Sequence, residues 1–269
     1  MKQNFTLELE VALDAARTAT ATILPYYYGE VEREQKNDGT PVTKADKESN
    51  RIIVEKISSA FPADGIVSEE MATISGKRMW YVDPIDGTNG FLCHDDHFAI
   101  HIGLADTEPL LGLVYKPTTG EYYYGGKHIG AYRVNPDGSR KQITASTKEE
   151  LILVASDTLL REQSDLIQII APYKVRTSGS QGLRMMQIAE GTANLHLKYR
   201  ASSGGTWDIC APQAIVEGAG GHVVYADSSP VTYHGQRDLE EQIIIVAANA
   251  KLKEYAESLL REYGTEKIK

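Results

Sequence analysis

The sequence predicts a mixed fold, of the α+β or α/β class, in which helices and sheets pack in layers. Helical periodicity dominates both ends of the chain, while short apolar runs typical of strands fill the middle. Turn residues, among them Asn135-Pro136-Asp137-Gly138, separate several of these runs. A chain of 269 residues fits one large domain or two tightly packed halves. We place a boundary after residue 145, which gives an N-terminal half of residues 1–145 and a C-terminal half of residues 146–269.

The N-terminal region predicts two helices joined by a loop. Apolar side chains recur at helical spacing over residues 7–24, and Pro25 is expected to end this first helix. The polar stretch 30–41 is expected to be an exposed loop. A second helix is expected over residues 43–60, with Ile53 and its apolar neighbours facing inward.

The middle of the chain predicts a largely antiparallel sheet, and the C-terminal part alternates strands with helices. The strands expected in the middle cover residues 79–82, 98–104, 110–115, 122–124 and 130–134. Two later apolar runs, 151–155 and 243–247, are continuous, as in strands that are buried on both faces. The later helices are expected over residues 182–190, 209–217 and 251–263.

Charge and composition exclude several classes of function. A formal net charge of −9 argues against a general nucleic-acid or membrane-surface binder, because either needs a basic surface. Two cysteines, Cys93 and Cys210, do not make a disulfide framework. The polar N-terminus lacks a signal core, and no run approaches the roughly 18 apolar residues of a membrane span. We therefore expect a cytoplasmic protein. The net charge does not exclude a small anionic ligand held by a local basic patch, and we expect a monomer or a homodimer.

The most informative segment is Trp80–Phe91, which reads Trp-Tyr-Val-Asp-Pro-Ile-Asp-Gly-Thr-Asn-Gly-Phe. Asp83 is expected to end a buried strand, and Asp86 supplies a second carboxylate three residues later. Mg²⁺ in proteins takes one or two carboxylates together with water and substrate phosphate. The N–H groups of Gly87-Thr88-Asn89 could hold that phosphate. The simpler reading is an Asp-rich turn in which Asp86 is an Asx-turn or capping residue.

Three other segments supply carboxylates, and each also has a simpler reading. The adjacent pair Glu69-Glu70 lies in a segment that follows two apolar residues, but it could be an acidic surface loop. Asp46 lies in the first turn of the second helix, where it could cap that helix through Thr43. Asp208, in Trp207-Asp208, could be the N-cap of a later helix.

Together these four segments resemble the inositol monophosphatase superfamily of lithium-sensitive, Mg²⁺-dependent phosphomonoesterases. The likeness runs from Pro41 to Gly221 and rests on Asp-Pro-Ile-Asp-Gly-Thr at 83–88, the downstream Trp207-Asp208 and a Gly-Gly at 220–221. The resemblance implies a layered α-β-α-β-α sandwich. It also implies a metal-dependent phosphatase that binds two or three Mg²⁺ ions per site and is inhibited by Li⁺.

The resemblance further implies roles for individual residues. The implied metal ligands are Glu69, Asp83, the backbone carbonyl of Ile85, Asp86 and Asp208. Asp83 would bridge two ions. Glu70 would lie next to the metal ligands without binding an ion itself. The implied catalytic residues are Asp46 and Thr88, which would orient and activate the attacking water, together with Glu69. The amides of Gly87 and Thr88 would bind the substrate phosphate.

Local matches favour one branch, the 3′(2′),5′-bisphosphate nucleotidases, which convert 3′-phosphoadenosine 5′-phosphate (PAP) to AMP and phosphate. Residues 86–92 resemble that branch's Asp-Gly-Thr-Lys-Gly-Phe-Leu, with Asn89 where Lys is common. Residues 207–212 resemble its Trp-Asp-Thr-Cys-Ala-Pro. The alternative substrate is inositol 1-phosphate, although Ala201 stands where inositol monophosphatases carry a Glu. A third possibility is a non-catalytic binding or regulatory protein that kept the fold.

A basic stretch supports a bisphosphate substrate. Between Leu166 and Trp207 a single acid, Glu190, accompanies five basic residues: Lys174, Arg176, Arg184, Lys198 and Arg200. This stretch is either a solvated basic face or a pocket for a second phosphate, to which Arg184 could bind in bidentate fashion. The complete set of expected substrate-binding residues is Gly87, Thr88, Asn89, Ser178, Ser180, Arg184 and Arg200.

Two other patterns are interpreted as structural features and not as functional sites. Cys93-His94-Asp95-Asp96-His97, followed by His101, contains ligands of transition metals. We interpret it as a polar loop that enters a strand over residues 98–104. The run Tyr26-Tyr27-Tyr28 is interpreted as packing at the end of a helix.

Overall fold

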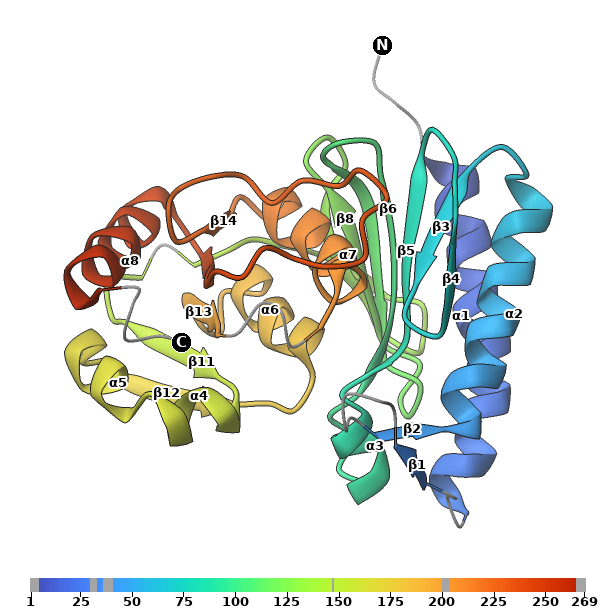
Figure 1. The fold of residues 1–269 in the computed structure, drawn as a ribbon, viewed down its shortest axis with the longest axis horizontal. Helices are drawn as coiled ribbons and strands as arrows, with labels where there is room; N and C mark the ends of the chain where they lie inside the picture. Colours follow the sequence, from blue (N-terminus) through green and yellow to red (C-terminus); the bar gives the residue numbers. More distant parts are fainter. Residues whose placement is uncertain (1–4, 30–32, 36–40, 147, 200–203, 265–269) are drawn as a thin grey trace.

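The computed structural model describes residues 5–29, 33–35, 41–146, 148–199 and 204–264. Its helices and sheets alternate in five layers, helix–sheet–helix–sheet–helix (Figure 1). This arrangement confirms the predicted sandwich. All strands of the larger sheet precede residue 144, and all strands of the smaller sheet follow residue 151.

The first layer consists of α1 (Thr6–Tyr28) and α2 (Lys44–Ala60), which pack on one face of the larger sheet (Figure 1). The expected end of α1 at Pro25 is wrong, because the helix continues for three more residues. Tertiary contacts hold this last turn. Tyr27 is buried against the rings of Phe91 and Phe98, and its hydroxyl donates to Asp96 at 2.9 Å.

The second layer is an eight-stranded sheet in the order β10-β9-β8-β7-β6-β5-β3-β4. Its strands are β3 (Gly65–Ser68), β4 (Met71–Ile74), β5 (Met79–Asp86), β6 (Ala99–Ala105), β7 (Pro109–Tyr115), β8 (Tyr122–Gly126), β9 (Gly130–Val134) and β10 (Arg140–Ile143). Neighbours pair antiparallel except β3 and β5, which are parallel. The largely antiparallel sheet was thus predicted, but β3, β4 and β10 were not.

The middle layer contains α6 (Gln181–Ala189) and α7 (Thr206–Gly218), which lie between the two sheets (Figure 1). Helix α7 approaches the larger sheet closely because β7 has a glycine at the contact. A Cβ added at Gly112 would lie 2.0 Å from the backbone oxygen of Ala211. This close packing places the first turn of α7 beside the end of β5.

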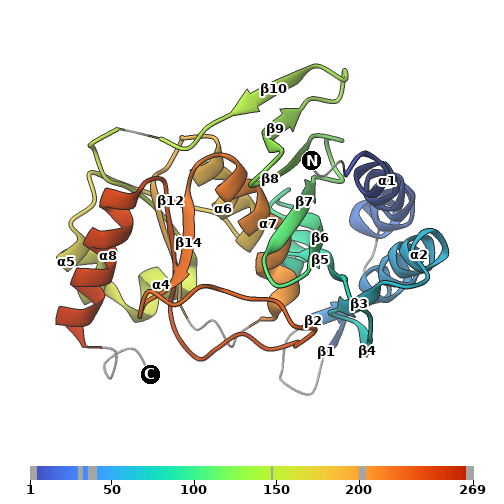
Figure 2. The ribbon, with the colours of Figure 1, turned by 90° about the horizontal axis from the view of Figure 1, so that it is seen from above.

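The fourth layer is a five-stranded sheet in the order β12-β11-β13-β15-β14. Its strands are β11 (Ile152–Ala155), β12 (Lys174–Thr177), β13 (Leu195–Lys198), β14 (His222–Tyr225) and β15 (Ile244–Ala247). The outer helices α4 (Asp157–Glu162), α5 (Ser164–Ile170) and α8 (Ala250–Tyr263) form the fifth layer (Figure 2). The continuous apolar runs predicted as buried strands are β11 and β15.

The region expected to be a loop between α1 and α2 contains two short strands. These strands, β1 (Arg33–Gln35) and β2 (Pro41–Thr43), pair antiparallel. Beside them lies α3 (Thr88–Cys93), the short helix that follows β5 (Figure 1). The start of α2 and the start of α3 therefore lie at the same end of the larger sheet.

Candidate active site

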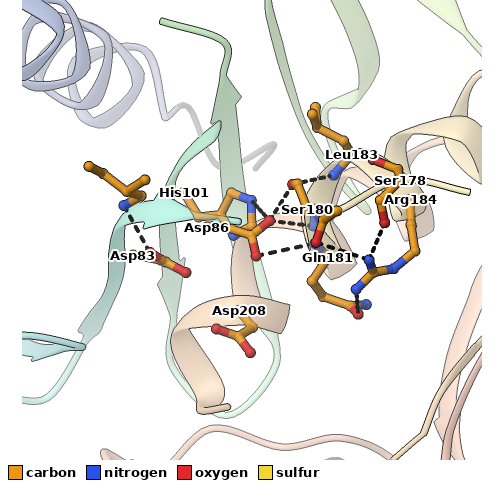
Figure 3. Close-up of polar contacts among 12 residues, drawn as sticks. Asp83, Asp86, His101, Ser178, Ser180, Gln181, Leu183, Arg184 and Asp208 are labelled. Carbon is orange, nitrogen blue, oxygen red and sulfur yellow. Dashed lines mark hydrogen bonds and ion pairs between the residues drawn. The ribbon is translucent and has the colours of Figure 1, made fainter. Parts of the chain in front are cut away.

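Strand β5 supplies two of the predicted carboxylates. The strand does not end at Asp83 as expected but continues to Asp86 through a register shift against β6. In this register Asp83 lies opposite His101, and Asp86 lies opposite Ala99. Because of the shift, two carboxylates three residues apart in one strand both reach the same buried region (Figure 3).

Asp83 is the most crowded of these carboxylates. It is buried, and its Oδ1 accepts a hydrogen bond from the backbone N–H of Ile85 at 3.0 Å, as in an Asx turn. Burial raises the pKa of Asp83 well above its usual value, and the negative charges of Glu69, Asp86 and Asp208 raise it further. Four carboxylates predicted from three separate segments therefore interact electrostatically in the fold.

Asp208 reaches the cluster from the C-terminal half. The N-cap of α7 is Gly205, so the alternative reading of Asp208 as the N-cap is wrong and Asp208 lies in the first turn. The Nζ of Lys198, at the end of β13, lies 3.1 Å from Asp208 Oδ2. Both side chains are largely buried. Lys198 was predicted only as one of five basic residues, and the structure places it directly beside a predicted metal ligand.

Asp86 is held by the start of α6. Its Oδ2 accepts from the Ser180 hydroxyl and from the Gly182 N–H at 2.8 Å, and its Oδ1 accepts from the Gln181 N–H at 3.1 Å (Figure 3). Burial alone would raise the pKa of Asp86. The charge of the nearby His101 ring, together with hydrogen bonds from Ser180 and Gly182, instead lowers this pKa below its usual value. Asp86 is therefore a fixed anion at neutral pH.

His101 was predicted as a strand residue and not as part of the site. It does lie in β6, but its fully buried ring points at the cluster, with Nε2 3.2 Å from Asp86 Oδ2. Neither ring nitrogen makes a hydrogen bond within the part of the chain that the structure describes, so Nε2 contacts Asp86 as a charge partner only. The other residues of the discounted motif, which span positions 93–97, are exposed. The discounted motif included His101, but only the pairing of β5 with β6 places this residue, and not the rest of the motif, beside Asp83 and Asp86.

The donor set fits divalent cations. Asp83, Asp86 and His101 can each direct one ligand atom so that these atoms lie within 4.8 Å of one another. Glu69 and Asp208 add negative charge near the buried Asp83, and burial and this charge together raise the pKa of Asp83. Hard divalent cations prefer such oxygen donors and would remove the repulsion.

The predicted water-activating pair, Asp46 and Thr88, lies at the starts of α2 and α3. Asp46 is buried, and its Oδ2 accepts from the Thr43 N–H at 2.8 Å and from the Thr43 hydroxyl at 2.6 Å. This is the capping box that the sequence allowed. The Thr88 hydroxyl donates to the Ile85 carbonyl at 3.3 Å. A role of the two residues in activating water stays a prediction.

The predicted substrate residues fall into two groups. Gly87, Thr88 and Asn89 lie at the start of α3, where Gly87 adopts a φ of 92°. Ser178 and Ser180 are buried in the loop before α6. Arg200 lies outside the described residues.

Arg184 is buried behind the loop that precedes α6. Its Nη1 donates to the carbonyls of Ser178 and Gly179 at 2.5 and 3.2 Å, and its Nη2 donates to Gln181 Oε1 at 2.8 Å (Figure 3). These contacts support the loop that carries Ser180. A direct contact between Arg184 and a substrate phosphate stays a prediction.

The chain is similar in sequence both to bisphosphate nucleotidases and to an inositol monophosphatase. The chain is 31% identical over 224 residues to the 3′(2′),5′-bisphosphate nucleotidase CysQ of Salmonella typhimurium, covering 80% of this chain and 89% of that protein. It is 29% identical over 274 residues to inositol monophosphatase 3 of Solanum lycopersicum, covering 94% and 97%. No helix among the described residues is long and apolar enough to cross a membrane.

Solved structures share the fold, and a family profile identifies the family. The suhB protein of Bartonella henselae superposes with a TM-score of 0.81 at 22% identity, covering 96% of this chain and 99% of that one. The IMPase of Thermotoga maritima gives a TM-score of 0.80 at 24% identity, with coverage of 96% and 99%. The profile of the inositol monophosphatase family matches residues 6–265. The chain therefore belongs to the inositol monophosphatase family of metal-dependent phosphatases.

Proposed function

We propose that this chain is a Mg²⁺-dependent 3′(2′),5′-bisphosphate nucleotidase that hydrolyses PAP to AMP and inorganic phosphate. The observation that carries the phosphatase chemistry is the buried cluster in which Asp83 is repelled by Glu69, Asp86 and Asp208. The observation that favours the nucleotide substrate is the likeness to nucleotidases such as the Salmonella enzyme. A cytoplasmic location and a monomeric or homodimeric state remain predictions.

The proposed metal ligands are Glu69, Asp83, the carbonyl of Ile85, Asp86 and Asp208. When bound, Mg²⁺ ions neutralise phosphate charge and make water a stronger nucleophile at neutral pH. The residues of the chain position the reactants, which is the main demand of phosphoryl transfer. Asp46 and Thr88 would orient the water, and the backbone N–H groups at Gly87-Thr88 would hold the phosphate. The bond between phosphorus and the 3′ oxygen breaks, the water oxygen joins phosphorus, and the 3′ oxygen leaves with a proton.

A release assay for inorganic phosphate tests the substrate. We would compare PAP, inositol 1-phosphate, fructose 1,6-bisphosphate and histidinol phosphate, each with Mg²⁺ and with EDTA. The proposal expects the highest kcat/KM for PAP and no release in EDTA. A higher kcat/KM for inositol 1-phosphate would instead support the second candidate, which the likeness to the tomato inositol monophosphatase favours. Release from none of the substrates would support a non-catalytic binding protein.

Lithium provides a separate test of the metal site. Li⁺ is a small hard cation that competes for carboxylate oxygen ligands, and the proposed site at Asp83, Asp86 and Asp208 is built from such ligands. We expect phosphate release to fall as Li⁺ rises through the millimolar range, with Na⁺ at the same ionic strength as the control. Equal rates in Li⁺ and Na⁺ would mean that the site does not accept Li⁺ in place of Mg²⁺.

A further inference from the structure

Two of the proposed metal ligands lie on elements from opposite halves of the chain. Glu69 is in the two-residue turn that connects β3 to β4. Asp208 is in the first turn of α7. Their side chains can serve one metal cluster only if the distance between the turn and the helix is fixed, because cation sites tolerate little change in ligand position.

Arg237 contacts both of these elements. It lies in the segment between β14 and β15, which reaches from the smaller sheet toward β3 and β4 (Figure 2). Its Nη1 donates to the carbonyls of Ser68 and Met71, each at 2.6 Å, and its Nη2 donates to the carbonyl of Glu69 at 3.0 Å. One guanidinium group therefore binds three carbonyls of the turn that carries Glu69.

The same residue also binds the start of α7. Its guanidinium carbon lies 4.6 Å from the centroid of the Trp207 ring, the residue before Asp208. Its backbone carbonyl accepts from the Thr206 N–H at 2.8 Å and from the Thr206 hydroxyl at 3.2 Å. The first turn of α7 is thus held by both the main chain and the side chain of Arg237.

We infer that Arg237 is a positioning residue that fixes the Glu69 turn relative to the Asp208 turn of α7, and thereby sets metal affinity. This inference rests on the proposed metal site. The planar fork of arginine suits the role, since it can donate to several acceptors while its face stacks on an aromatic ring. Lysine would keep the charge but cannot make the same set of contacts. Arg237 is only half-buried, so water can replace its donors without unfolding the chain.

Arg78 offers a matched control. It also donates to two groups, Glu8 Oε1 and Asp64 Oδ2, each at 2.8 Å, and its guanidinium lies 5.6 Å from the Phe61 ring centroid. It is likewise partly buried. However, it precedes the first residue of β5, at the opposite end of that strand from Asp83 and Asp86. Replacing it should leave the metal cluster unchanged.

The test is titration of metal-free protein with Mn²⁺, with free Mn²⁺ measured by electron paramagnetic resonance. We expect Arg237→Lys and Arg237→Gln to weaken Mn²⁺ binding about 10- to 100-fold, the range typical of residues that orient metal ligands. Arg78→Lys should bind Mn²⁺ like the wild type. Thermal unfolding in EDTA, which is independent of metal, should place Arg237→Lys within a few degrees of Arg78→Lys.

The outcomes separate this inference from the metal site itself. Wild-type affinity in both Arg237 variants would overturn the inference while leaving the metal site intact. An equal loss of affinity in Arg78→Lys, or failure of both Arg237 variants to fold, would also overturn it, because Arg237 would then act only through general stability. No Mn²⁺ binding by the wild-type protein would instead refute the proposed metal site.

Discussion

Asp83 and Asp86 show how the environment separates two carboxylates that are three residues apart. Asp86 accepts hydrogen bonds from three donors of the C-terminal half and faces His101, so its pKa is lowered in spite of burial. Asp83 accepts a hydrogen bond from the local Ile85 N–H and is buried beside three other carboxylates, so its pKa is raised. The fold thus fixes one anion with protein donors and leaves the other for a cation to stabilise.

His196 is another buried polar residue, and it makes stability depend on pH. Its Nδ1–H donates to the Val154 carbonyl at 2.8 Å, and its Nε2 lies 3.0 Å from the Gln181 side-chain nitrogen. Burial, aided by the charge of Arg184, lowers the pKa of His196 to about 3. In the unfolded chain its pKa is near the usual value of about 6.5. Below that pH the unfolded state binds a proton that the folded state does not, so stability falls.

We therefore expect His196 to reduce the free energy of unfolding by about 2 kcal/mol between pH 7.5 and pH 5.0. Urea unfolding in EDTA at pH 7.5, 6.5 and 5.0 measures this loss. His196→Gln should be less stable at pH 7.5 but should lose about 2 kcal/mol less than the wild type on acidification. Parallel losses in both proteins would show that other groups cause the pH dependence.

At the scale of elements, the loop before α6 and the first residues of that helix hold the Asp86 carboxylate by hydrogen bonds. Ser180 and the N–H groups of Gln181 and Gly182 bind the carboxylate, while Arg184 binds the carbonyls on the other side of the loop. The sequence predicted α6 and the involvement of Ser180 and Arg184. From the sequence, we assigned both residues to substrate binding. The contact of Ser180 and its neighbours with Asp86 could not be predicted, because it joins residues that are 94 to 96 positions apart.

Arg184→Ala tests which assignment holds. If Arg184 supports the loop, its loss should disturb Asp86 and lower kcat/KM about 10- to 100-fold for PAP and for 3′-AMP alike. If it binds the second phosphate, the loss should affect PAP and spare 3′-AMP, which has only one phosphate. The structure favours equal losses, because both Nη groups already donate to protein acceptors. Steady-state kinetics on the two nucleotides decides between them.

For the whole molecule, the cluster forms only when the two halves pack together. Glu69, Asp83 and Asp86 come from elements of the larger sheet, whereas Asp208 comes from α7. The sequence predicted these four carboxylates because each lies in a short local motif, and it predicted the layers because apolar periodicity is local too. It could not predict His101, Lys198 or Arg237 as parts of the site. Their roles depend on strand register and on contacts between halves.

The central claim is that a buried carboxylate cluster binds the divalent cations needed to hydrolyse a phosphate monoester. The most direct measurement compares phosphate release from PAP by wild type and Asp83→Asn, first in EDTA and then after Mg²⁺ is restored. We expect wild-type activity to disappear in EDTA and to return with Mg²⁺, and Asp83→Asn to stay at background at every Mg²⁺ concentration. Asp83→Asn should still fold, with a thermal midpoint in EDTA at or above that of the wild type, because it removes like-charge repulsion. Near-normal turnover by folded Asp83→Asn in saturating Mg²⁺ would contradict the claim.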